Sequence, residues 1–146
     1  MIVRRAAGAD LELAHQALTE VHCREAVNDA AVEKSLADPS CYLMLAIEDG
    51  RVIGSLIGHA LRKAHRRELQ FLLYEIDVRQ ECRNRGVGRA LVEAFVAEAR
   101  AAGAFEIWVL TNQSNLAAMK MYSACGFRRV HGDDVMFSLD LRKPGS

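Results

Sequence analysis

The fold is decided by one stretch, Arg79-Gln80-Glu81-Cys82-Arg83-Asn84-Arg85-Gly86-Val87-Gly88-Arg89, which joins an apolar run to an amphipathic one. Leu69–Val78 before it has the composition of a strand, and Gly88–Ala102 after it has helical periodicity. Two glycines allow the backbone to approach a ligand closely, and the first amides of a helix have no partners within that helix. Four arginines add positive charge where the helix dipole is already positive. The stretch therefore predicts a site for an anion such as a pyrophosphate.

The segments that follow this stretch extend the pattern. Phe105–Leu110 is short, apolar and β-favouring, so the interval from Leu69–Val78 through the helix predicts a right-handed β-α-β unit with parallel strands. A further helix is expected over Ser114–Ala124, ended by Gly126. The tail predicts a final antiparallel pair of strands, Phe127–Val130 and Val135–Leu141.

The segments that precede it predict a meander of strands with helices at the start. Asp49-Gly50 lies between two β-rich runs and is a strong hairpin signal. One helix is expected from Asp10 to about His22, and a second from Asn28 or Asp29 to a point before Pro39. The expected strands of this half are Ile2–Arg5, Cys41–Ile47 and Val52–Leu61.

Size and composition limit the class of protein. The 146 residues are 51% hydrophobic, enough for a single domain over 1–146 with a real core. The 19 acidic and 19 basic residues give zero net charge, so no whole-molecule field favours nucleic acid or an anionic membrane. The chain shows neither a signal peptide nor a membrane-length apolar run, so we expect a cytoplasmic location. The cysteines have no metal-binding spacing and are expected to be reduced thiols without a metal: Cys23, Cys41, Cys82 and Cys125.

Three local patterns, in this order, resemble the GNAT superfamily of acyl-CoA N-acetyltransferases. Arg83–Gly88 is similar to the family's Gln/Arg-x-x-Gly-x-Gly/Ala signature, and the hairpin around Gly50 with Val52-Ile53-Gly54 is similar to its turn between the second and third strands. Asn115-Leu116-Ala117-Ala118, with Met121-Tyr122 and Cys125-Gly126-Phe127, resembles its Asn-x-x-Ala, Tyr and Gly-Phe series. A P-loop or dinucleotide fold is excluded, because the lysine of the first and the third glycine of the second are missing.

The resemblance implies a mixed α/β (α+β) fold. Its central, mostly antiparallel sheet has six to seven strands, with a parallel pair splayed at the cofactor site and about four flanking helices. It also implies acetyl-CoA as cofactor, with the Val78 amide near the thioester carbonyl as an oxyanion donor. Asn115 has an alternative role as a helix cap. The residues implied to bind the cofactor are Ile76, Val78, Arg83, Asn84, Arg85, Gly86, Val87, Gly88, Arg89 and Asn115.

Candidate catalytic groups lie on the strand and on the last helix. Strand alternation predicts Leu73, Glu75 and Asp77 on one face, with Tyr74, Ile76 and Val78 on the other. Neighbouring carboxylates raise the pKa of one of them, which favours Glu75 as the base that takes a proton from an amine. The alternatives are Asp77, a water chain, or a merely solvated acidic face. Tyr122 matches the tyrosine that protonates the departing thiolate in many relatives, although a packing role also fits.

Three segments look most like aminoglycoside 3-N-acetyltransferases within the superfamily: Leu61-Arg62-Lys63, Tyr74-Glu75-Ile76-Asp77-Val78 and Asp133–Asp140. This resemblance implies direct attack by an amine in a ternary complex. A polycationic small molecule would need an acidic cleft, for which Glu75, Asp77, Asp133 and Asp134 are the candidates. The alternatives are a polyamine, an amino acid derivative, a protein N-terminus or lysine as acceptor, or a silent acyl-CoA sensor. The family commonly dimerises, so a homodimer is one expected state. The five histidines are left unassigned.

Overall fold

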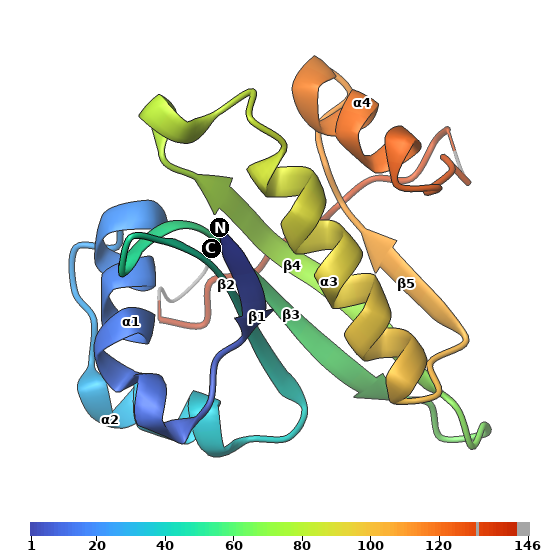
Figure 1. Ribbon diagram of the computed structural model, residues 1–146. Helices are drawn as coiled ribbons and strands as arrows, with labels where there is room; N and C mark the ends of the chain where they lie inside the picture. Colours follow the sequence, from blue (N-terminus) through green and yellow to red (C-terminus); the bar gives the residue numbers. More distant parts are fainter. Residues whose placement is uncertain (131, 143–146) are drawn as a thin grey trace.

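The computed structural model describes residues 1–130 and 132–142, and its centre is one five-stranded sheet with the order β1-β2-β3-β4-β5 (Figure 1). Neighbouring strands are antiparallel except for β4 and β5, which are parallel as predicted. The strands are β1 Ile2–Arg5, β2 Cys41–Glu48, β3 Arg51–Arg62, β4 Leu69–Val78 and β5 Glu106–Val109.

Helices cover both faces of the sheet (Figure 1). The long helix α3 lies across one face, and the N-terminal helices pack on the other. The four α-helices of the described residues match the expected number, but the first predicted helix is divided into a 3-10 turn, an α-helix and a π-helical turn. The bounds are η1 Gly8–Asp10, α1 Leu11–Gln16, η2 Ala17–Val21, α2 Asp29–Ala37, η3 Gln80–Cys82, α3 Val87–Ala101 and α4 Leu116–Ala124.

Local sequence explains where several elements begin and end. The β2–β3 hairpin turns at Asp49 and Gly50, which both have positive φ (51° and 74°), as the predicted Asp-Gly turn requires. Asn28 caps α2 by accepting a hydrogen bond from the Ala31 amide at 3.0 Å. Gly103 ends α3 with φ 73°.

Close packing fixes α3 on the sheet. A Cβ atom at Gly58 of β3 would come within 2.3 Å of the Phe95 ring, which is fully buried. A Cβ at Gly54 would meet the side chains of Val87 and Leu91 at 2.9 and 3.1 Å. Glycines in β3 therefore let the helix lie directly on the strand, which fixes the position of the turn that precedes the helix.

The prediction of six to seven strands is wrong, because the described residues form five. The predicted pair Phe127–Val130 and Val135–Leu141 has no strand among the residues that the structure describes, and His131 of its turn lies outside them. The alternating apolar residues of this tail are exposed, with Phe137 91% and Leu141 90% accessible. β-Propensity depends on a neighbouring strand to pair with, and this segment does not pair with the edge of β5.

A β-bulge at Tyr74 changes the predicted faces of β4. Ile57 pairs with Glu75 whereas Gly58 pairs with Leu73, so Tyr74 has no residue opposite it. Leu73 is therefore buried in the core under α3, and it does not share a face with Glu75 as simple alternation predicts. Ile76 and Val78 pack against the same core cluster as Leu73. The carboxylates of Glu75 and Asp77 lie on the opposite face, toward the N-terminal helices.

Candidate functional site

The turn between β4 and α3 presents unpaired backbone donors. Gly86 and Asn84 have positive φ (81° and 61°), and the chain enters α3 at Val87 without a side-chain cap or an acidic residue in the first turn. The first amide bonded to the turn is that of Ala90, which donates to the Gly86 carbonyl at 3.0 Å. The amides of Val87, Gly88 and Arg89 precede it and have no acceptor within the helix. They form a cradle for an anion at the positive end of the helix dipole.

The arginines of this turn are balanced by carboxylates; the i,i+4 pair of Arg89 with Glu93 is as the helical spacing predicts, whereas the partners of Arg83 and Arg85 were not predicted. Arg83 contacts Asp77 at 3.3 Å, Arg85 contacts Glu48 at 2.8 Å, and Arg89 contacts Glu93 at 2.8 Å. These three arginine side chains are roughly half exposed, and such pairs add little to stability because solvent screens them. An anion that binds here would replace carboxylates that hold the arginines only weakly. The backbone amides supply the fixed part of the site.

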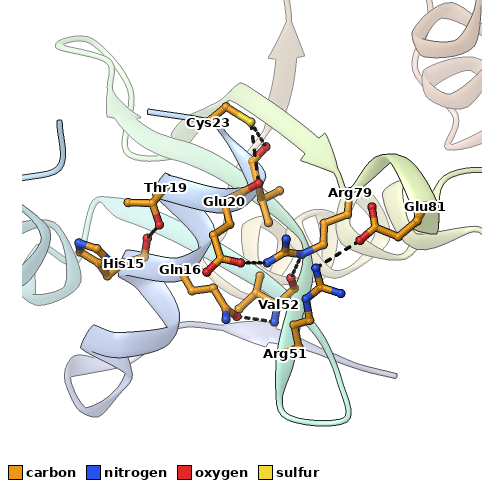
Figure 2. A network of polar contacts seen from close by, with 10 residues as sticks. His15, Gln16, Thr19, Glu20, Cys23, Arg51, Val52, Arg79 and Glu81 are labelled. Carbon is orange, nitrogen blue, oxygen red and sulfur yellow. Dashed lines mark hydrogen bonds and ion pairs between the residues drawn. The ribbon is translucent and has the colours of Figure 1, made fainter. Parts of the chain in front are cut away.

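Arg79 anchors the start of the turn to the N-terminal helices (Figure 2). Its side chain is only 9% exposed; Nε donates to the Val52 carbonyl at 2.7 Å, and Nη2 contacts Glu20 of η2. The Val52 amide in turn donates to Oε1 of Gln16 at 2.7 Å. The same network brings Arg51 to Glu81 at 3.2 Å. The turn is thereby tied to β3 and to α1 and η2.

An open strand edge lies beside the cradle. β4 and β5 pair only from Gln70–Glu106 to Leu73–Val109, so β4 continues to Val78 without a neighbour on that side. The Arg79 amide donates to the Ile53 carbonyl of β3 at 2.9 Å. Because amide directions alternate along a strand, the amides of Ile76 and Val78 point toward the open side. The Val78 amide is held there by Oδ1 of Asp77 at 2.9 Å.

Glu75 lies in a cluster of polar and charged groups on the face of β4 that is turned away from α3. Its carboxylate forms an ion pair with Arg24, and its Oε2 lies 3.9 Å from Nδ1 of His22. The His22 side chain is 4% exposed, and burial lowers its pKa although Glu75 and Asp77 oppose that shift. Nε2 of His22 and Oγ of Ser55 are buried without a hydrogen-bond partner among the described residues.

His22 and Arg24 were not predicted as site residues. Their separation from Glu75 is about fifty positions along the chain, and nothing in the local sequence of residues 22–28 indicates that they meet β4. The predicted pair Glu75 and Asp77 does share one face, but each carboxylate has an arginine partner. The local charge of these four groups is therefore balanced.

Tyr122 lies on α4, and Asn115 is the residue that precedes this helix. The Tyr122 side chain belongs to the core cluster that includes Val87, and burial raises the pKa of its phenol, which stays protonated at neutral pH. No hydrogen bond of its hydroxyl is found within residues 1–130 and 132–142. Asn115 caps α4 by accepting from the Ala118 amide at 3.1 Å. A Cβ at Gly88 would lie 2.9 Å from Sδ of Met121, so α4 directly abuts the first turn of α3.

Asp133 and Asp134 are not brought to the cluster. Both are exposed and lie in a segment without regular secondary structure after α4. No ion pair or hydrogen bond among the described residues joins them to Glu75 or Asp77. The predicted acidic cleft therefore lacks two of its four carboxylates in this structure, because the described residues of the predicted hairpin form no strands.

The described part of the chain contains no group of metal-binding side chains and no helix with the length and apolarity that a membrane span requires. All four cysteines are free.

A mixed sheet that opens between two parallel strands, beside an anion cradle at the start of the connecting helix, defines the class of acyl-CoA N-acyltransferases. Residues 11–127 match the family model described as "Acetyltransferase (GNAT) family". The chain belongs to this family, whose members transfer acetyl groups and use acetyl-CoA.

Relatives and solved structures agree with this assignment. N-acetyltransferase 8B of Homo sapiens is 29% identical over 90 residues, which are 62% of this chain but 39% of that protein. The chain thus spans about two fifths of that relative's length. An aminoglycoside acetyltransferase, meta-AAC0020, from an uncultured soil metagenomic sample, solved with sisomicin, has a TM-score of 0.80 at 18% identity, covering 96% of this chain and 95% of that one. Aminoglycoside N-acetyltransferase AAC(6')-Iy in complex with CoA has a TM-score of 0.76 at 21% identity, covering 95% and 98%. At these identities the likeness to the solved structures concerns the fold.

Proposed function

We propose that the protein transfers the acetyl group of acetyl-CoA to a primary amine of a small molecule, by direct attack in a ternary complex. One observation carries the proposal: the amides of Ile76 and Val78 at the unpaired edge of β4, the carboxylate of Glu75 and the anion cradle all lie within one strand and the turn that follows it. The acetyl donor and the amine that accepts the acetyl group would therefore meet at one end of β4.

The residues present fit coenzyme A. The cradle offers free amides and no carboxylate in the first turn of α3, which suits a pyrophosphate. The unpaired edge of β4 offers backbone groups to the peptide-like pantetheine arm, in the manner of an added strand. When bound, the cofactor supplies an activated acetyl thioester. Arg83, Asn84, Arg85, Gly86, Val87, Gly88 and Arg89 would hold its pyrophosphate, and Ile76 and Val78 its arm; Asn115 would contribute through the start of α4.

The protein side of the reaction consists of three tasks. Glu75 accepts a proton from the acceptor ammonium, because only the neutral amine is a nucleophile. The Val78 amide donates to the oxygen on which negative charge develops, a contribution of about 3 kcal/mol for one such donor. That amide must first be released by Asp77, or shared with it. Tyr122, kept protonated by burial, donates a proton to the leaving sulfur.

An aminoglycoside, acetylated at its 3-N amine, is the first acceptor hypothesis. Its support is the similarity in fold to aminoglycoside acetyltransferases, one solved with sisomicin and another named as a 6'-type enzyme. Against it stands the balanced charge around Glu75, since a polycation would have to displace Arg24 and Arg83 from their carboxylates. Polyamines, amino acid derivatives and protein amines are the alternatives.

Thiol release from acetyl-CoA tests the proposal. The purified protein is expected to bind CoA in calorimetry and to release thiol when a suitable amine is added. The panel should contain an aminoglycoside, spermidine, amino acids and a lysine peptide. Tight CoA binding without thiol release from any amine would instead support a silent acyl-CoA sensor.

Tyr122→Phe tests the proton donor. Turnover is expected to fall at least several-fold, because the leaving thiolate must then take its proton from water, while acetyl-CoA affinity is retained. Steady-state kinetics and calorimetry measure the two quantities separately. Ser123→Ala, which removes a hydroxyl from the next position of the same helix, is the control and should leave turnover unchanged. Unchanged turnover in Tyr122→Phe would remove Tyr122 from the mechanism.

A further inference from the structure

We infer that the acceptor is an α-amino acid, or a small aminocarboxylate like one, with an apolar side chain that enters a cavity beside Glu75. The inference rests on the proposed function and names its acceptor class. Three neighbouring features carry it: a small apolar cavity, Arg24 in the lining of that cavity, and the ion pair of Arg24 with Glu75.

The cavity lies between the N-terminal helices and the sheet, on the same face of β4 as Glu75. It has a volume of about 260 Å³ and is open on one side. Its floor includes Ile57, the residue that pairs directly with Glu75 across β3 and β4. Its lining is mainly aliphatic and includes Leu18, Val27, Val32, Leu36, Leu43 and Ile57.

The size of the cavity favours a single side chain. Pockets for drug-sized ligands have volumes of roughly 300 to 1,000 Å³ and bury most of the ligand surface. A cavity below that range, lined by aliphatic groups, suits an aliphatic or aromatic side chain better than the hydroxyl- and amine-rich rings of an aminoglycoside. Burying such a side chain contributes to binding through the apolar area removed from water.

The charges at the mouth of the cavity favour a zwitterion. Arg24 is about half exposed, and its position is fixed because its backbone amide donates to the Leu18 carbonyl at 3.0 Å. Its Nη2 contacts Glu75, which leaves other guanidinium donors for a second carboxylate. An ammonium and a carboxylate on one carbon atom can face Glu75 and Arg24 together, so that four alternating charges remain balanced. A polycation would instead leave Arg24 repelled and unpaired.

The reaction balances for this acceptor. The acceptor nitrogen forms a bond to the acetyl carbon as the carbon–sulfur bond breaks. The acceptor ammonium loses two protons in total. One passes through Glu75 to solvent. The leaving sulfur takes a proton from Tyr122, and the second proton lost from the nitrogen is balanced by the proton that Tyr122 regains from solvent. The products are an N-acetyl amino acid, CoA thiol and one released proton.

The test compares acceptors that differ by one group, with thiol release from acetyl-CoA as the readout. Phenylalanine is compared with phenylalanine amide, which lacks the carboxylate, with glycine, which lacks the side chain, and with sisomicin. We expect kcat/KM for phenylalanine to exceed that for its amide by about ten- to a hundredfold, as for a hydrogen bond between charged groups. Glycine is expected to be poorer by about tenfold or more.

Two variants separate the two recognition elements. Arg24→Gln is expected to bring the ratio between phenylalanine and its amide close to one, while CoA binding is retained. Ala31→Phe, at an exposed position of α2 that lines the cavity, is expected to raise KM for phenylalanine about tenfold and to leave KM for glycine unchanged. Ala30→Phe is the matched control, because Ala30 is exposed on the same helix but does not line the cavity.

The outcomes distinguish the inferred amino acid acceptor from the proposed acetyltransferase function. The inference would be overturned if thiol release with sisomicin or with phenylalanine amide equals or exceeds thiol release with phenylalanine. The acetyltransferase function would then still stand. Equal kinetics of Ala31→Phe and Ala30→Phe with phenylalanine would overturn the role of the cavity. If none of the amines causes thiol release, the proposed function is overturned and the inference with it.

Discussion

Gly86→Asp is expected to weaken acetyl-CoA binding by about ten- to a hundredfold. The new carboxylate would accept hydrogen bonds from the free amides at the start of α3 and would repel the pyrophosphate. Folding should survive, because a Cβ at Gly86 meets no atom within 4 Å and aspartate tolerates positive φ better than most residues. Calorimetry with CoA measures the affinity, and a thermal melt without CoA measures the stability.

Gly103→Asp is the matched control for this variant. Gly103 also has positive φ (73°) and free space around it, but it ends α3 at the opposite end from the cradle. Both variants therefore carry the same backbone strain, and only Gly86→Asp should lose CoA affinity. Equal affinities for CoA in the two variants would show that the cradle does not hold the pyrophosphate.

Glu75→Gln is expected to lower kcat/KM for the amine by about a hundredfold or more, since general bases contribute 10²- to 10⁴-fold. Glutamine keeps the size of the side chain but cannot take up a proton. The rise of the rate with pH should therefore flatten, leaving only the dependence on the protonation of the amine itself. Rates measured over a pH series with saturating acetyl-CoA provide the test.

Asp77→Asn separates the two carboxylates of β4. Asp77 contacts Arg83 and accepts from the Val78 amide, whereas Glu75 contacts Arg24 and lies near His22. If Glu75 is the base, Asp77→Asn keeps the pH dependence of the wild type. A flattened profile in Asp77→Asn together with an unaltered one in Glu75→Gln would assign the base to Asp77.

Most of the helices and strands from α2 to α4 could be predicted from the sequence. Local signals were sufficient there: the Asp49-Gly50 turn, the cap Asn28, the break at Gly103 and the βαβ interval all act over a few residues. The open parallel pair β4 and β5 also followed from the family resemblance and is confirmed.

The remaining features depend on tertiary pairing. The bulge at Tyr74 leaves no trace in an alternating sequence, because it is decided by how Ile57 and Gly58 of β3 align with β4. The partners of two of the arginines lie far away in sequence, 37 positions for Arg85 and Glu48 and 59 for Arg79 and Glu20. The tail at 135–141 has strand composition, but no strand edge accepts it in this structure.

Adjacent residues of β4 serve the two proposed reactants, the amine and the thioester, in turn: one residue presents its side chain and the next presents its backbone amide. Glu75 and Asp77 would face the amine, and the backbone N–H groups of Ile76 and Val78 would face the thioester. Consecutive strand residues are about 3.3 Å apart along the strand. The spacing of the backbone positions that carry the proton acceptor and the oxyanion donor is thus set by the strand itself, and loop motions elsewhere in the molecule can change how fast the ligands arrive without changing that spacing.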